Sequence, residues 1–169
     1  TQDDARDDTP AFHFNYDEVS QPGNVKTTLI DRNGYSQEFV YDFSYRLLSH
    51  KNELGLSTTK TYDKLGQVTS TIDPKGKVSN YSYDQLNRLT SVTDPLSGTS
   101  LQEFNAAGNR LNITDPNGNQ LTFTYDNAGR IVSQKDGNNN TVTYTYNNLG
   151  EIATRINGRG QTASFSYDK

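Results

Sequence analysis

The sequence predicts an all-β chain of tandem β-hairpin repeats, each 21 residues long, that form a coiled, open antiparallel sheet. Three observations lead to this prediction. An aromatic residue recurs every 21 residues, two sets of turn residues recur with it, and apolar and polar residues alternate between the turns. Equal spacing maintained over the chain is the signature of a repeat architecture.

The repeat is defined by positions that keep a fixed distance from its aromatic residue. Asp or Asn follows the aromatic residue directly, Gly stands four residues after it in most copies, and a second Asp stands eleven after it. The predicted structural repeat positions are Tyr41, Tyr62, Tyr83, Phe104, Tyr125, Tyr146 and Tyr167; Asp63, Asp84 and Asp126; Gly66, Gly108, Gly129 and Gly150; and Asp73, Asp94, Asp115 and Asp136. In the first and third regular copies, Tyr45 and Asn87 replace the Gly.

The second half of each repeat has the pattern of a half-buried strand. Leu121, Phe123 and Tyr125 alternate with Thr122 and Thr124, and the copies ending at Tyr146 and Tyr167 alternate in the same way. Alternation with period two places the apolar side chains on one face of a strand and the hydroxyls on the other. The first half, such as residues 88–93, is β-branched but less regularly patterned.

Two kinds of turn join these strands. Asp73-Pro-Lys-Gly76 and Asp115-Pro-Asn-Gly118 have Asp first, Pro second and Gly fourth, which suits a type I turn and its hairpin variants. Gly129, in the other turn, can adopt a positive φ. A single hairpin is marginally stable, so successive hairpins are expected to pair side by side, with the aromatic residues stacked on their equivalents 21 residues away.

The predicted domain organisation follows the spacing. Residues 1–11 are acidic and aperiodic and are expected to form a poorly ordered arm or connection, and residues 12–169 form the repeat sheet. Within this sheet, residues 16–40 are a looser unit, 41–166 are regular repeats, and 167–169 begin another.

Composition excludes several classes of protein. The net charge of −4 and the pI near 5.1 leave no basic stripe for nucleic acid. No apolar run is long enough for a membrane helix, the first residues lack the pattern of a signal peptide, and the absence of Cys excludes disulfides and thiol chemistry.

Tyr83-Asp-Gln-Leu-Asn-Arg-Leu89 with Asp94-Pro95, and Tyr125-Asp-Asn-Ala-Gly-Arg-Ile131, closely resemble the YD repeats of the RHS family. That family includes bacterial polymorphic toxins, insecticidal Tc toxin components and animal teneurins. The resemblance, over about residues 12–169, implies a hollow β-sheet shell that often encloses a toxic domain, and a secreted or cell-surface location. Neither the self-cleavage site nor the effector of the toxin-bearing members is present in this sequence.

Candidate sites for chemistry have simpler structural explanations. Residues 115–119 and 136–140 offer oxygen ligands for Ca²⁺ but lack the carboxylate set of a strong site, and turn chemistry accounts for them. Asp84 with Arg88, and Asp126 with Arg130, suit loop capping and ion pairing better than acid catalysis, because they recur once per hairpin.

No catalytic or cofactor constellation is predicted. His13 and His50 lie in different repeats without ligand-spaced partners, and no known catalytic motif is present, so the chain is expected to be neither an enzyme nor a cofactor-binding protein. The tyrosine ladder could line a sugar-binding groove, although stacking within the sheet is the simpler interpretation.

The leading functional prediction is a non-catalytic shell or scaffold segment that encloses or presents a polypeptide such as a toxin domain. The alternative is an extracellular binding module for carbohydrate or a cell-surface protein. The expected partners are further YD repeats of the same protein, or another copy of this chain, paired through the open sheet edges, together with an enclosed polypeptide.

Overall fold

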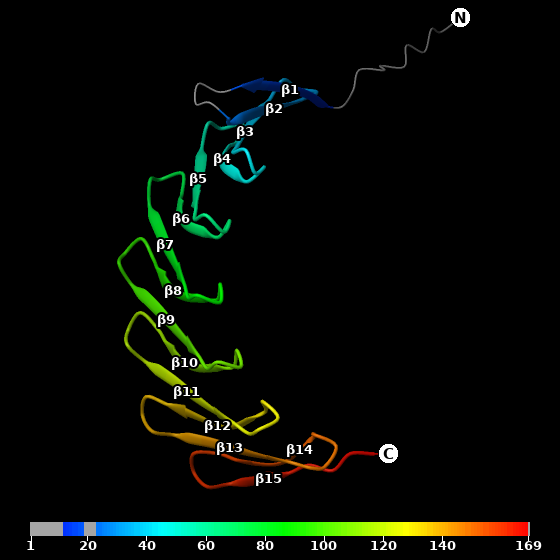
Figure 1. Cartoon of the computed structure of the whole chain (residues 1–169), viewed down its shortest axis with the longest axis vertical. Helices are drawn as coiled ribbons and strands as arrows, with labels where there is room; N and C mark the ends of the chain where they lie inside the picture. The colour runs from blue at the N-terminus through cyan, green and yellow to red at the C-terminus, as the bar shows by residue number, and fades with distance from the viewer. Residues whose placement is uncertain (1–11, 19–22, 169) are drawn as a thin grey trace, which may run out of the picture. The chain divides into compact units, whose positions relative to one another are not determined.

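The computed structural model describes residues 12–18 and 23–168, and every regular element in this part of the chain is a β-strand (Figure 1). The strands are β1 (Phe12–Glu18), β2 (Val25–Asp31), β3 (Ser36–Tyr41), β4 (Leu47–Lys51), β5 (Ser57–Tyr62), β6 (Val68–Ile72), β7 (Val78–Tyr83), β8 (Leu89–Thr93), β9 (Thr99–Phe104), β10 (Arg110–Thr114), β11 (Gln120–Tyr125), β12 (Ile131–Asp136), β13 (Thr141–Tyr146), β14 (Ile152–Ile156) and β15 (Thr162–Ser164). The predicted acidic arm, residues 1–11, lies outside the described residues, as does Lys169. Among the described residues, no helix is long and apolar enough to cross a membrane.

The chain divides into two compact units, residues 1–80 and 81–169, with the boundary inside β7. In the first unit, β1 to β7 follow chain order and neighbouring strands pair antiparallel. In the second unit, β8 to β15 are ordered and paired in the same way. The prediction of an all-β chain of consecutive hairpins in an open antiparallel sheet is therefore confirmed.

All the regular turns share one backbone geometry, although the sequence suggested two kinds. In the turn of residues 126–130, Asp126 N donates to Arg130 O at 2.9 Å and Gly129 N donates to Asp126 O at 3.0 Å. The turn of residues 115–119 repeats both hydrogen bonds. This is the three-residue hairpin loop, a type I turn followed by one residue in the left-handed conformation.

The fourth turn residue carries that left-handed conformation. Gly129 has a φ of 77° and Gly118 a φ of 82°, values that glycine adopts without steric cost. Where the sequence departs from Gly, the backbone does not change, because Tyr45 and Asn87 have φ values of 59° and 64°. The turn geometry is therefore imposed by the sheet even where the residue type does not favour it.

In five hairpins, a β-bulge lies in the strand that follows the recurring aromatic residue. In the hairpin of β11 and β12, Thr124 pairs with Ser133 but Tyr125 pairs with Ile131, so Val132 is left without a partner of its own. The same shift occurs between β3 and β4, β5 and β6, β9 and β10, and β13 and β14. Such a bulge bends the strand and increases its twist.

The sheet is a single layer with no enclosed core. Among the described residues, none, apolar or polar, is buried. The predicted alternation is present, since Leu121, Phe123 and Tyr125 are partly buried while Thr122 and Thr124 are exposed. On the hydroxyl face, cross-strand hydrogen bonds join Thr124 to Ser133 and Thr145 to Thr154. Cohesion must therefore come from contacts between neighbouring strands and repeats.

Candidate functional site

The acidic residue that opens each turn serves as its cap. Asp126 Oδ1 accepts hydrogen bonds from Ala128 N at 2.9 Å and from Arg130 N at 3.0 Å, and Oδ2 accepts Arg130 Nε at 2.7 Å. The backbone N–H of Arg130, followed by its side chain, lowers the pKa of Asp126 below its usual value. Asp84 has the same contacts with Leu86 and Arg88. Its pKa is also lowered, and the largest cause is the hydrogen bond from the Arg88 side chain. These carboxylates are fully engaged in capping and ion pairing.

The arginine that closes such a turn also contacts the next repeat. The Arg46 guanidinium lies 4.9 Å from the ring centroid of Tyr62, and its Nη1 donates to Asp63 O at 2.9 Å. Arg88 relates to Phe104 and to Asn105 O in the same way, at 4.7 Å and 2.9 Å. We call this set of contacts the arginine clamp.

Arg130 completes the series. Its guanidinium lies 4.4 Å from the ring centroid of Tyr146 and forms an ion pair of 2.7 Å with Asp126. Burial beneath this contact raises the pKa of the Tyr146 hydroxyl. A cation over an aromatic face is a favourable contact, so each clamp joins two adjacent repeats.

The tyrosine hydroxyls form a second link between repeats. In four copies the hydroxyl donates to the carbonyl of the residue that is paired with the preceding aromatic residue, at the bulge. These bonds are Tyr62 to Leu47 O at 2.8 Å, Tyr125 to Arg110 O at 2.6 Å, Tyr146 to Ile131 O at 2.7 Å and Tyr167 to Ile152 O at 3.0 Å. The recurring Tyr therefore bonds a carbonyl at the bulge of the preceding repeat.

The expected stacking of rings 21 residues apart is wrong for Tyr125 and Tyr146. Tyr146 is linked to the preceding repeat instead by its hydroxyl, which donates to Ile131 O, and by the Arg130 guanidinium that lies over its ring. A stacked pair of rings is formed instead by Phe39 and His50, with centroids 4.6 Å apart.

The arginine clamp is present only in alternate repeats. Its position is held by Arg46, Gln67, Arg88, Asn109, Arg130 and Glu151, in that order along the chain. Asn147 Nδ2 donates to Glu151 Oε2 at 2.8 Å, so that copy keeps a side-chain contact within its own turn. Asn109, by contrast, makes hydrogen bonds to Asn105 through its backbone, with Asn109 N donating to Asn105 Oδ1 at 2.9 Å and Asn109 O accepting Asn105 N at 2.9 Å. The 42-residue alternation was missed in the sequence analysis, although it is visible there as Arg at every second copy.

A hollow of about 610 Å³ lies where Asn109 replaces the arginine. It is lined by Asn105, Ala107, Asn109, Leu111, Phe123, Thr124, Tyr125, Asp126, Asn127, Ala128 and Gly129. These residues come from the turns of residues 105–109 and 126–130 and from the adjoining strands β10 and β11. No lysine or arginine is among them, so a ring face, amides and one carboxylate define the hollow.

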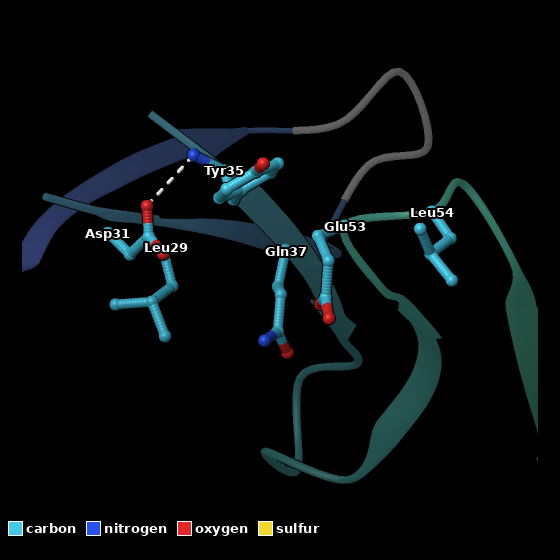
Figure 2. A pocket seen from close by; sticks show the side chains of 6 residues that line it. All are labelled: Leu29, Asp31, Tyr35, Gln37, Glu53 and Leu54. Carbon is cyan, nitrogen blue, oxygen red and sulfur yellow. Dashed lines mark hydrogen bonds between the residues drawn. The ribbon is translucent and has the colours of Figure 1, made fainter. Parts of the chain in front are cut away.

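A second hollow, of about 380 Å³, lies in the first unit, beside the turns of residues 31–35 and 52–56. Figure 2 shows its lining residues, which are Leu29, Asp31, Tyr35, Gln37, Glu53 and Leu54. The Asp31 carboxylate is occupied as a turn cap, since its Oδ1 accepts hydrogen bonds from Asn33 N and from Tyr35 N, the latter at 2.9 Å (Figure 2). Tyr35 and Leu54 are 61% and 77% exposed, so this hollow is a shallow surface feature.

The turns considered for Ca²⁺ use their oxygens internally. Asp115 Oδ1 accepts Asn117 N and Asn119 N, and its Oδ2 accepts Asn119 Nδ2 at 2.7 Å. The Asn119 side chain is the main cause of the lowered pKa of Asp115. Asp136 is held in the same way by Asn138 and Asn140. In the described part of the chain, no three His, Cys, Asp or Glu side chains gather as a metal-ligand set.

The remaining predicted positions also lie in these turns. Gly66, Gly108, Gly129 and Gly150 are fourth turn residues with positive φ, and Asp73, Asp94, Asp115 and Asp136 open the turns of the opposite edge. His50 stacks on Phe39 and its Nε2 is 2.9 Å from Gln37 Oε1, which is a packed histidine. The side chain of His13 lies outside the described residues.

Comparisons with known proteins identify a family that this chain matches. A family model described as Teneurin YD-shell matches residues 3–169. Comparison with curated proteins gives no match.

Solved structures share the fold. A crystal structure of TcdB2-TccC3 superposes with a TM-score of 0.55 and 15% identity over 86% of this chain, and the same complex without its hypervariable C-terminal region gives the same values. The Photorhabdus luminescens Tc holotoxin pore, with a mutation in TccC3, gives 0.51 and 16% over 87%. The chain spans 10% of the two TcdB2-TccC3 chains and 8% of the pore chain.

Proposed function

Because this chain belongs to the teneurin YD-shell family, we propose that it forms a section of shell wall that encloses or presents a polypeptide. The observation that carries the proposal is the single-layer sheet, in which no described residue is buried. A domain that acts alone normally covers its apolar surface in a core. A wall has no such need, because its neighbours are further repeats and whatever it surrounds.

The links between repeats support the same role. They are made from residues at fixed repeat positions, namely the tyrosine hydroxyl and, in alternate copies, the arginine clamp. Nearest-neighbour links of this kind let a wall extend by adding repeats, with no contact between distant parts of the chain. None of these residues gathers into a pocket suited to catalysis, and we propose a structural, non-catalytic role.

The unpaired strands at the open sheet edges are where the wall would bind its partners. In the second unit, β15 pairs with β14 alone, so the outer backbone groups of β15 face no other strand of the described part of that unit. Unpaired strand edges pair with other strands. We propose that they pair with further YD repeats or with a second copy of this chain.

The pairing is tested by sedimentation velocity of the 169-residue chain over a hundredfold range of concentration, since association through edges is driven by mass action. We expect the weight-average sedimentation coefficient to rise with concentration. A single monomeric species at every concentration would argue against pairing through open edges.

Enclosure is tested separately, in the protein that contains this chain together with its neighbouring repeats. Limited proteolysis of the intact protein should spare a polypeptide held inside the wall and cleave it after the wall is opened by denaturant. If the internal polypeptide is cleaved as fast in the native protein as in the opened one, the wall does not enclose it. We also propose that the protein is delivered to the cell surface or to the medium. Fractionation of the producing cells measures this location.

The second candidate is an extracellular module that binds carbohydrate. Phe165 and Tyr167, on the aromatic face at the end of the second unit, are 46% and 48% exposed, and a partly exposed ring can stack on a sugar. A glycan array is the direct measurement. Binding that is lost in Phe165→Ala and Tyr167→Ala would support this candidate, and an array without binders would remove it.

A further inference from the structure

We propose that the hollow beside Tyr125 is a binding site for a guanidinium group, supplied by an arginine side chain of a second polypeptide. The proposal does not depend on whether the chain is a shell wall. It rests on the comparison of this repeat with the repeats that carry the arginine clamp.

The clamped repeats show what the position accepts. In three copies, the chain's own guanidinium lies over the aromatic ring sixteen residues further on, at 4.9, 4.7 and 4.4 Å from the centroid. In two of these copies, Nη1 also donates to the backbone carbonyl of the residue after that ring, at 2.9 Å in both. The position therefore combines a ring face with a carbonyl acceptor, which suits the planar donor fork of arginine.

The Asn109 repeat keeps the acceptors but lacks the donor. Tyr125 is the aromatic residue sixteen positions after Asn109, and its hydroxyl is fixed by Arg110 O at 2.6 Å. Asp126 O is the equivalent carbonyl, and it accepts Gly129 N at 3.0 Å, just as Asp63 O accepts Gly66 N beside the Arg46 donor. Asn109 is too short to span the ring, and the hollow of about 610 Å³ occupies this place.

Space for the incoming group is built into the next turn. A Cβ at Gly150 would lie 3.5 Å from Arg130 Nη1, and one at Gly66 would lie 3.8 Å from Arg46 Nη1. At the corresponding glycine here, Gly129, the Asn109 side chain takes that place, with Nδ2 3.6 Å from the Cβ position. Glycine therefore lines the route in this repeat as well, and the incoming guanidinium must move the Asn109 amide aside.

The lining of the hollow favours a cation. Its charged member is Asp126, it contains no lysine or arginine, and its amides come from Asn105, Asn109 and Asn127. Arg130 pairs with Asp126 Oδ2, so the ring face and the backbone carbonyl are the main attractions that remain. For this reason we expect weak binding of a single arginine, in the millimolar range, which strengthens when a partner presents it together with other contacts.

The test uses the 169-residue chain labelled with 3-fluorotyrosine, with the Tyr125 resonance assigned through Tyr125→Phe. The probe is the tripeptide acetyl-Gly-Arg-Gly-amide, and matched probes carry lysine or the neutral isostere citrulline in place of arginine. We expect a saturable shift of the Tyr125 resonance with the arginine probe, a weaker one with lysine and none with citrulline. Absence of a saturable shift at Tyr125, or an equal response to citrulline, would overturn the proposal.

Two variants test the structural reasoning in opposite directions. The double variant Asn105→Asp, Asn109→Arg supplies the missing clamp from within the chain, and it should weaken probe binding at Tyr125 by at least about tenfold. Arg130→Asn removes an existing clamp and should create a second site, seen as a new probe-dependent shift at Tyr146. Thermal unfolding of both variants verifies that they are folded at the temperature of the titration.

Methyl glycosides are the last arm of the experiment. If they shift the Tyr125 resonance and the arginine probe does not, the hollow is a sugar site and the guanidinium proposal is wrong. If the double variant binds the probe as well as the unmodified chain does, the clamp position is not the binding site. Either result leaves the proposed wall function untouched, because that function is measured through edge pairing.

Discussion

The turns of residues 105–109 and 126–130 have the same backbone and different connections. Both close with the same pair of backbone hydrogen bonds, and in both the first side chain accepts the backbone N–H of the fifth residue. Only the second turn sends a guanidinium to the next repeat, where Arg130 covers Tyr146. The hairpin and its attachment to the next hairpin are therefore encoded at different positions, and one can change while the other is kept.

The largest effect is expected from Arg130→Asn, which makes the second turn resemble the first. The variant loses the cation–π contact with Tyr146, about 1 kcal/mol, and the ion pair with Asp126 in addition. The free energy of unfolding, measured by urea titration, should fall by at least that amount. Asn105→Asp, Asn109→Arg is the matched reverse change and should raise it; equal stabilities of all three proteins would show that the clamp contributes nothing.

A slightly smaller effect is expected from Tyr146→Phe. The variant keeps the ring beneath Arg130 but loses the 2.7 Å hydrogen bond to Ile131 O, with an expected loss of about 1 kcal/mol. Phe104→Tyr is the natural control, because Phe104 stands where the other regular repeats have Tyr. That variant should gain stability in the same urea titration, and a loss there would indicate that the bulge carbonyl of its neighbour is out of reach.

Tyr45→Gly measures the steric cost of a positive φ at the fourth turn residue and leaves the arginine clamp of Arg46 in place. Tyr45 has a φ of 59° and is 84% exposed, so its replacement relieves steric strain while removing little packing. Because glycine also loses more backbone entropy on folding, the net gain is expected to be about 0.5 kcal/mol. Thermal unfolding of Tyr45→Gly beside Asn87→Gly tests this prediction, with a smaller gain expected for Asn87, since Asn tolerates a positive φ.

The smallest effect concerns pH. Contacts with Arg88 and Arg130 lower the pKa values of Asp84 and Asp126 below the usual 3.8. The stability that these carboxylates contribute is therefore fully present above that pH and is lost as the pH falls through the folded-state pKa. We expect the urea midpoint to fall below pH 4, and to fall less in Asp84→Asn, Asp126→Asn, where no charge remains to titrate; identical pH profiles would contradict the assignment.

Much of the hairpin could be predicted from the sequence because its determinants are local. Asp at the first turn position, Gly at the fourth and alternation in residues 121–125 each act within a few neighbours, and the strands and turns lie where these signals place them. Turn chemistry and strand alternation operate over such short distances. The same locality explains why both sets of turns, although different in sequence, have one geometry.

The links between repeats could not be predicted, because they depend on the register between strands. The sequence predicts an ion pair of Arg130 with Asp126 of its own turn. The contact of Arg130 with Tyr146, sixteen residues away, depends in addition on the bulge at Ile131 and Val132. A shift of one residue changes which side chains share a face. The expected stacking of Tyr125 and Tyr146 is likewise absent, and the Tyr146 ring carries the Arg130 guanidinium and a hydrogen bond to Ile131 O.

A sheet without buried residues also has a distinctive thermodynamic signature. The heat-capacity change of unfolding scales with the apolar surface that unfolding exposes, and globular chains average about 12–15 cal/mol/K per residue. Here even Phe123 and Tyr125 are only partly buried in the native state, so the increment should be lower than that average. The stability curve of the isolated chain is then broad and flat, and its melting temperature is sensitive to small changes in the contacts between repeats.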